Sequence, residues 1–160
     1  MDIVDHIVDH LGGPIAWREA GAGRPILFLH GLGGSRYAWE AQLESLAASA
    51  RCIAWDMPGY GASQAIEPLT FPAIVDAIVG LLDRLELASV DVVGLSFGGQ
   101  QAMHLAIGHP DRVRRLVLAD TSPRFGADGT DPEAWKLARL AALDGGRTPA
   151  DIAPAALDAI

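Results

Sequence analysis

Cysteine, positive charge and long apolar runs are all scarce in this chain, and each shortage excludes a class of protein. A single cysteine, Cys52, cannot form an internal disulfide or a cysteine-based zinc site, and we expect it to be a small buried core residue. The 12 Lys and Arg residues against 20 Asp and Glu residues give a net charge of −8, which disfavours nucleic-acid binding and attachment to anionic lipid. No apolar stretch reaches the roughly 20 residues of a membrane span, and no basic leader follows Met1. The sequence therefore predicts a cytoplasmic protein with no nucleic-acid or membrane partner.

What the chain does have is short apolar runs separated by 18 glycines and 10 prolines. Half of the residues are apolar and 20% are charged, a composition that excludes intrinsic disorder and suits one domain with a core. Runs typical of strands buried on both faces occupy residues 25–29, 51–55, 89–94 and 115–119, after a predicted hairpin of residues 3–10 and 14–20. Helical spacing alternates with these runs, over residues 36–48, about 70–85 and 97–108. This alternation predicts an α/β fold, with a mostly parallel sheet and helices on both faces.

Beyond Asp120 the alternation stops and the pattern becomes helical only. Asp131-Pro132-Glu133 combines a cap, a proline and an acid in the order typical of a helix start. Gly145-Gly146 ends that helix, and Thr148-Pro149 begins another. The last part of the chain therefore differs in architecture from the part before it.

The chemistry of the chain is indicated by residues 94–98, with the sequence Gly-Leu-Ser-Phe-Gly. This G-x-S-x-G pattern follows a buried strand and opens a helix, which is the setting that a strained strand-to-helix turn requires. Side chains at Gly94 and Gly98 would collide with the flanking elements, so glycine is expected at both positions. Such a turn projects the hydroxyl of Ser96 above the carboxyl ends of the strands, where ligands bind in α/β sheets.

A second glycine-rich loop, residues 30–34, also follows a buried strand. Its glycines let backbone N–H groups approach a ligand, so the amides of Leu32 and Phe97 are candidates to stabilise an oxyanion together. Phe97 lies at a helix N-terminus, which adds a favourable dipole. For His30 we favour a structural role, in which its ring bonds the loop backbone, over a catalytic one.

Three segments together resemble the α/β-hydrolase family. They are His30-Gly31 after one strand, residues 56–63 (Asp-Met-Pro-Gly-Tyr-Gly-Ala-Ser) after the next, and residues 94–99 after the third. The segments stand in the family's order and at its spacing, and residues 112–118 are similar to the family's next strand. Within the family, the sequence is similar to 3-oxoadipate enol-lactonases, small bacterial esterases and cofactor-free haloperoxidases.

The resemblance implies an α/β-hydrolase core over residues 1–125 and the start of a helical cap over residues 126–160. It implies Ser96 as the nucleophile of a serine hydrolase, with Leu32 and Phe97 as the donors of the oxyanion hole. Asp56 would then hold its loop in place rather than take part in catalysis. The expected reaction is hydrolysis of a small ester or lactone through an acyl-enzyme, without a metal or organic cofactor.

A serine nucleophile needs a base oriented by an acid, and in this family both follow the serine along the chain. His104 lies roughly 12 Å along the axis of the helix that Ser96 opens, and His109 lies farther still. Asp120 follows a predicted strand, and whether it is the acid or only anchors a loop stays open. We therefore expect the acid and the histidine beyond residue 160, and a truncated, inactive chain when the 160 residues stand alone.

Two alternative functions remain open at this point, together with one structural consequence of truncation. A cofactor-free haloperoxidase or perhydrolase would use the same site, and peroxide-dependent halogenation would distinguish it from an esterase. A non-catalytic module would keep the fold without an activated serine, so it would not react with a fluorophosphonate. Finally, the strand at residues 115–119 would form an exposed apolar sheet edge, through which a truncated chain would associate with itself.

Overall fold

A computed structural model describes residues 2–10, 13–124, 129, 131–148 and 151. Its strands are β1 (Val4–His10), β2 (Gly13–Ala20), β3 (Pro25–Leu29), β4 (Arg51–Trp55), β5 (Val90–Leu95) and β6 (Val113–Ala119). Its helices are α1 (Glu40–Leu46), α2 (Phe71–Arg84), α3 (Phe97–Gly108) and α4 (Pro132–Asp144), with 3-10 turns η1 (Arg36–Trp39) and η2 (Pro110–Arg112). The chain divides into two compact units, Met1–Ser122 and Pro123–Ile160. The expected boundary between residues 125 and 126 lies outside the described residues.

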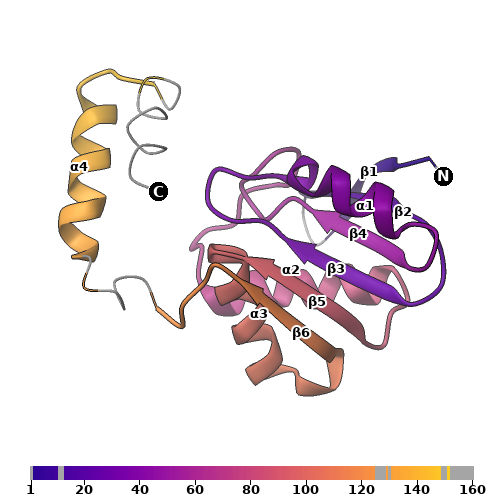
Figure 1. The fold of residues 1–160 in the computed structure, drawn as a ribbon. Helices are drawn as coiled ribbons and strands as arrows, with labels where there is room; N and C mark the ends of the chain where they lie inside the picture. Colours follow the sequence, from indigo (N-terminus) through magenta and orange to yellow (C-terminus); the bar gives the residue numbers. More distant parts are fainter. Residues whose placement is uncertain (1, 11–12, 125–128, 130, 149–150, 152–160) are drawn as a thin grey trace. The chain divides into compact units, whose positions relative to one another are not determined.

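The described strands form one sheet in the order β1-β2-β4-β3-β5-β6 (Figure 1). β1, β2 and β4 pair antiparallel, whereas β4, β3, β5 and β6 pair parallel, which confirms the predicted hairpin and the mostly parallel sheet. Leu29 stands opposite Gly94, and Leu95 stands opposite Ala119. Because of this register, the carboxyl ends of β3, β5 and β6 lie side by side, and the loops that follow these strands leave the sheet there.

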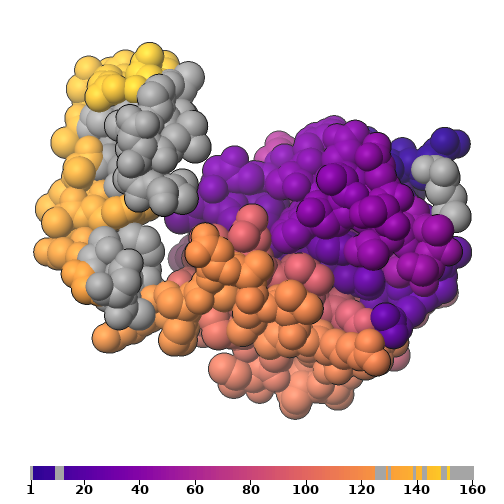
Figure 2. All heavy atoms as spheres, in the orientation of Figure 1, coloured from indigo at the N-terminus to yellow at the C-terminus, as the bar shows by residue number. Residues whose placement is uncertain are grey.

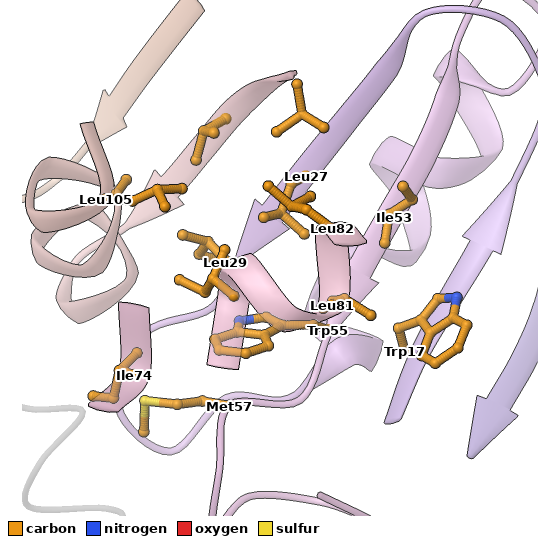
Figure 3. Packing of buried hydrophobic residues seen from close by; sticks show 14 of the residues in the cluster. Trp17, Leu27, Leu29, Ile53, Trp55, Met57, Ile74, Leu81, Leu82 and Leu105 are labelled. Carbon is orange, nitrogen blue, oxygen red and sulfur yellow. The ribbon is translucent and has the colours of Figure 1, made fainter. Parts of the chain in front are cut away.

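The two faces of the sheet are covered by different helices, as the alternation of side chains along the strands requires. On one face α1 covers Phe28 of β3 and the small residues Cys52 and Ala54 of β4, and Cys52 is fully buried as expected. On the other face α2 and α3 cover large side chains from the same strands. Figure 3 shows this second cluster, which includes Trp17, Leu27, Leu29, Ile53, Trp55, Met57, Ile74, Leu81, Leu82 and Leu105.

The helices begin where the sequence provides a cap. The hydroxyl of Thr70 accepts a hydrogen bond from the N–H of Ala73 at the start of α2. The single helix predicted over residues 36–48 is only partly correct, because its first turn is the 3-10 turn η1 and α1 begins at Glu40. Asp56 holds both the backbone and the guanidinium of Arg36, so this turn is fixed from outside the helix.

The apolar run of β6 is typical of a strand buried on both faces, but β6 lies at the exposed sheet edge that the sequence also predicts. Leu116, Val117 and Leu118 are 37%, 53% and 43% exposed, because β6 is an edge of the described sheet. Figure 2 shows the atoms of this strand, in orange, at the surface of the first unit. Self-association through this edge remains a prediction.

In the second unit, α4 begins and ends where the sequence indicates. Asp131 Oδ1 accepts hydrogen bonds from the N–H groups of Glu133 and Ala134, at 3.0 and 3.3 Å. The helix stops before Gly145-Gly146. The helix predicted from Thr148-Pro149 falls mostly outside the described residues. Within the described part of the chain, no helix is long and apolar enough to cross a membrane.

Candidate active site

Ser96 lies between β5 and α3 in a backbone conformation that side chains rarely adopt. Its φ is 53° and its ψ is −117°, although it is not a glycine, and its side chain is exposed. The Ser96 N–H donates to the carbonyl of Ala119 at 2.9 Å, and the Ser96 carbonyl accepts from the Thr121 hydroxyl at 2.7 Å. Hydrogen bonds to the N–H and to the carbonyl of Ser96 thus hold its strained backbone in place. Such strain persists only where the surrounding structure fixes the residue.

The glycines around Ser96 are fixed by close backbone contacts. A Cβ at Gly94 would overlap the carbonyl of Gly98, and a Cβ at Gly98 would overlap the carbonyl oxygen of Leu29. A Cβ at Gly99 would meet the side chain of Thr121. The predicted steric reason for glycine at positions 94 and 98 is therefore confirmed.

The loop after β3 adjoins the side chain of Ser96. The N–H of Gly34 donates to the carbonyl of Gly31 at 3.1 Å, which closes a tight turn with Leu32 in it, and Gly33 has a φ of 74°. A Cβ on Gly31 would lie only 3.7 Å from Ser96 Oγ, so the hydroxyl lies directly against this loop. Phe97 is the first residue of α3, where N–H groups lack an acceptor within the helix. Both backbone segments that carry the predicted donors thus adjoin Ser96.

His30 lies beneath this loop and is 1% exposed. Its Nε2 accepts a hydrogen bond from the N–H of Met57 at 3.1 Å, and its Nδ1 lies 2.8 Å from the carbonyl of Gly31, to which it donates. Burial lowers the pKa of His30, which matches a neutral ring with one donor and one acceptor nitrogen. The structural role expected for His30 is confirmed, since its ring ties the loops after β3 and β4.

Asp56 is fully buried in the loop after β4 and pairs with Arg36. Its Oδ1 accepts from the backbone N–H of Arg36 at 2.7 Å, and its Oδ2 accepts from the N–H of Ala62 at 2.9 Å and from the Arg36 guanidinium. The carboxylate fills the space that a Cβ at Gly61 would need. Asp56 therefore holds its loop, as predicted, but its partner Arg36 lies 20 residues away and carries no local sequence signal.

Two other histidine rings pack against aromatic side chains rather than against Ser96. The ring of His104 stacks on Phe71, with centroids 4.1 Å apart, and the ring of His6 stacks on Trp17. β1, which carries His6 and His10, is separated from β5 by three strands. His109 follows the last residue of α3, at the end opposite to Ser96.

Asp120 is the one acid candidate from the sequence, and it follows β6 directly. Its side chain is exposed and its φ is 45°, a left-handed conformation that aspartate tolerates. The structure places it one residue after Ala119, whose carbonyl accepts from the N–H of Ser96. Among the described residues, no group of three or more His, Cys, Asp or Glu side chains is arranged to hold a metal ion.

Comparisons with known proteins agree with this geometry. Residues 24–147 match the family described as alpha/beta hydrolase fold. A 2-hydroxymuconate semialdehyde hydrolase from Pseudomonas sp. (strain CF600) is 46% identical over 105 residues, which cover 62% of this chain and 37% of that protein. A pimeloyl-acyl-carrier-protein methyl ester esterase from Neisseria meningitidis is 32% identical over 122 residues, 76% of this chain and 46% of that protein.

The solved structures give the same result. A hydrolase from Pseudomonas aeruginosa PA01 has a TM-score of 0.75 at 32% identity, over 86% of this chain and 52% of that one. An epoxide hydrolase from Vigna radiata has a TM-score of 0.69 at 30% identity, over 72% of this chain and 38% of that one. The chain spans about half of the length of these relatives, or less.

Proposed function

The chain belongs to the alpha/beta hydrolase fold family, and from that premise we propose that it carries the nucleophile and the oxyanion hole of a serine hydrolase. The substrate would be a small ester or lactone. The observation that carries the proposal is the backbone of Ser96, which is held at a φ of 53° with its side chain exposed at the end of β5. A serine that only capped a helix would adopt an extended conformation without this strain.

In the proposed reaction, Ser96 Oγ attacks the substrate carbonyl carbon and its proton passes to a base. The carbonyl oxygen becomes an oxyanion between the N–H groups of Leu32 and Phe97, which stabilise it more than they stabilise the ground state. The intermediate collapses to an acyl-enzyme as the bond from the carbonyl carbon to the alkoxy oxygen breaks and the protonated base gives its proton to that oxygen. An ester thereby releases its alcohol, whereas the hydroxyl formed from a lactone stays attached to the acyl chain. Water then hydrolyses the acyl-enzyme, which releases the acid and restores the hydroxyl of Ser96.

The base and the acid that orients it complete the proposal. We expect a histidine from outside these 160 residues, because the rings of His6 and His104 stack on aromatic side chains and His30 uses both of its nitrogens. A chain of these 160 residues produced alone is accordingly expected to show no turnover.

An uncharged acyl group fits the surroundings of Ser96. The side chain of Leu32 is 53% exposed beside the site, and Phe97 follows the nucleophile, so the neighbours that the sequence supplies here are apolar. The relatives are named as hydrolases, and one of them as the esterase of a methyl ester, which supports an ester as the substrate class.

Reaction with a fluorophosphonate tests the proposal, because the reagent labels only activated serines. The protein as its gene encodes it should take one equivalent, and mass spectrometry should place the adduct on Ser96. Ser96→Ala should abolish both this adduct and the hydrolysis of 4-nitrophenyl acetate. Ser45→Ala, which removes an exposed hydroxyl from α1, should change neither. Absence of the adduct in the unaltered protein, or its appearance on another residue, would overturn the proposal.

A further inference from the structure

Met57 connects three segments that carry the proposed site. Its side chain is 1% exposed, at the end of the cluster between the sheet and α2, beside Ile74 (Figure 3). Its backbone N–H donates to His30 Nε2 at 3.1 Å, and its sulfur accepts from Gln101 Nε2 at 3.0 Å. The loop after β3, the loop after β4 and helix α3 are therefore joined through one residue.

Gln101 is an unusual residue for its place. It is fully buried, while its neighbours Ala102 and Leu105 on α3 belong to the apolar cluster. Its Oε1 has no hydrogen-bond partner among the described residues, and its Nε2 donates to a thioether, which is a weak acceptor. A buried amide that is so poorly satisfied costs stability, and an apolar side chain would avoid the cost. Stability alone therefore does not account for glutamine at this position.

The position of this contact relates it to the two predicted oxyanion donors. Gln101 lies four residues after Phe97 on the same helix, so the two move as one body. His30 lies two residues before Leu32, and its ring also bonds the loop through Gly31. A path of direct contacts thus runs from α3 through Met57 to the loop that carries Leu32.

We propose that Met57 and Gln101 are positioning residues, which set the spacing between the N–H groups of Leu32 and Phe97. The inference rests on the proposed function, since it assigns these residues a part in the same oxyanion hole. Without the contact between Gln101 and Met57, α3 and the loop after β3 keep their folds, but their separation is less strictly defined. An oxyanion hole depends on such separations, because its donors must point at the place where charge develops.

The expected effect is smaller than the loss of a donor. Removal of one oxyanion donor lowers kcat by about 100- to 1,000-fold, whereas here both N–H groups remain and only their alignment changes. We expect kcat and the rate of fluorophosphonate labelling to fall about tenfold when the contact is removed. KM should change less than about twofold, because the ground state of the substrate does not use this alignment.

The test compares Gln101→Met, Met57→Leu and the double variant in the protein as its gene encodes it. Methionine is unbranched and close to glutamine in length, so Gln101→Met removes the amide with little change of volume. Gln42→Met makes the same exchange on the exposed face of α1 and serves as the matched control. The measurements are kcat and KM for 4-nitrophenyl acetate, the labelling rate of Ser96, and the urea midpoint of each variant.

The proposal predicts a specific combination of results. Gln101→Met should unfold at an equal or higher urea concentration than the unaltered protein, yet turn over about tenfold more slowly. The double variant should be no slower than the slower single variant, because both remove the same contact. A kcat for Gln101→Met within about twofold of the unaltered protein, with the fold intact, would overturn the positioning role. If the unaltered protein neither hydrolyses the ester nor takes the label on Ser96, the proposed function fails and the positioning role fails with it.

Discussion

Replacement of Asp56 by asparagine should destabilise the protein far more than loss of a typical ion pair. Asp56 is fully buried and accepts hydrogen bonds from the backbone of Arg36, from its guanidinium and from the N–H of Ala62. The asparagine amide would keep one oxygen as an acceptor, but it would turn an NH2 group toward another donor. Arg36 would retain its contact with Asp5 at 2.9 Å, so its charge would lose its buried partner but keep the more exposed one.

These contacts set the magnitude of the effect. Removal of one partner from a buried ion pair costs about 3–5 kcal/mol, because the other charge is left in the interior. The contact between Arg36 and Asp5 compensates part of this cost, so we expect a loss near the lower end, about 3 kcal/mol. For a chain of this size, 1 kcal/mol corresponds to about 2–4 °C in Tm, so Asp56→Asn should melt about 6–12 °C lower.

Urea unfolding followed by tryptophan fluorescence measures the loss, since Trp55 precedes Asp56 and is fully buried. The matched control is Asp83→Asn, which removes the charge that pairs with Arg112. The side chain of Asp83 is 64% exposed. Exposed pairs contribute only about 0–1 kcal/mol. If Asp56→Asn costs no more than Asp83→Asn, the buried pair does not hold the loop.

Three further predictions concern the residues around the nucleophile. His30→Gln should make the free energy of unfolding fall less steeply in acid. Burial lowers the pKa of His30 below 6.5 in the folded protein, so the unfolded chain binds a proton that the folded ring does not. The contribution of His30 to stability is therefore present in full above pH 6.5 and is lost as the pH falls below it. Urea midpoints from about pH 7.5 to 4.5 test this, and parallel curves for both proteins would contradict it. Ser96→Gly should abolish hydrolysis and raise the free energy of unfolding by about 1 kcal/mol, because glycine adopts a positive φ without strain. An unchanged or lower free energy of unfolding would argue against strain at Ser96. Gly98→Ala should cost several times more than Gly108→Ala, where a Cβ meets open space, and similar melting temperatures for the two would refute the close contact with Leu29.

Much of the first unit is predictable because its local signals agree with one another. β3 and β4 occupy the same residues that the apolar runs indicate, and α3 has the predicted bounds. The apolar run of β6 alone indicates a buried strand, and its exposure was predicted only from its expected place at the sheet edge. The 3-10 turn at Arg36 was not predicted, since its cause is a side chain 20 residues away.

The candidate site divides in the same way. Ser96 and the glycines beside it are readable because backbone strain restricts which residues can stand there. The contacts of Met57 were not predicted, because His30 and Gln101 lie 27 and 44 residues away and meet it only in the folded chain. A buried glutamine in a helix has no distinctive local pattern. Gln101 follows a second glutamine, and two adjacent polar residues in a helix indicate solvent exposure rather than burial.

The unequal size of the side chains on the two faces of β4 limits how this strand can change during evolution. On the α1 face, Ala54 and Cys52 are fully buried, so larger side chains at these positions would overpack the core. On the α2 and α3 face, Ile53 and Trp55 of the same strand fill the space, so their replacement by smaller residues would leave cavities. Adjacent residues of β4 are thus selected alternately against larger and against smaller side chains. The side chain of Leu32 beside Ser96 is 53% exposed, so neither limit on size applies to it.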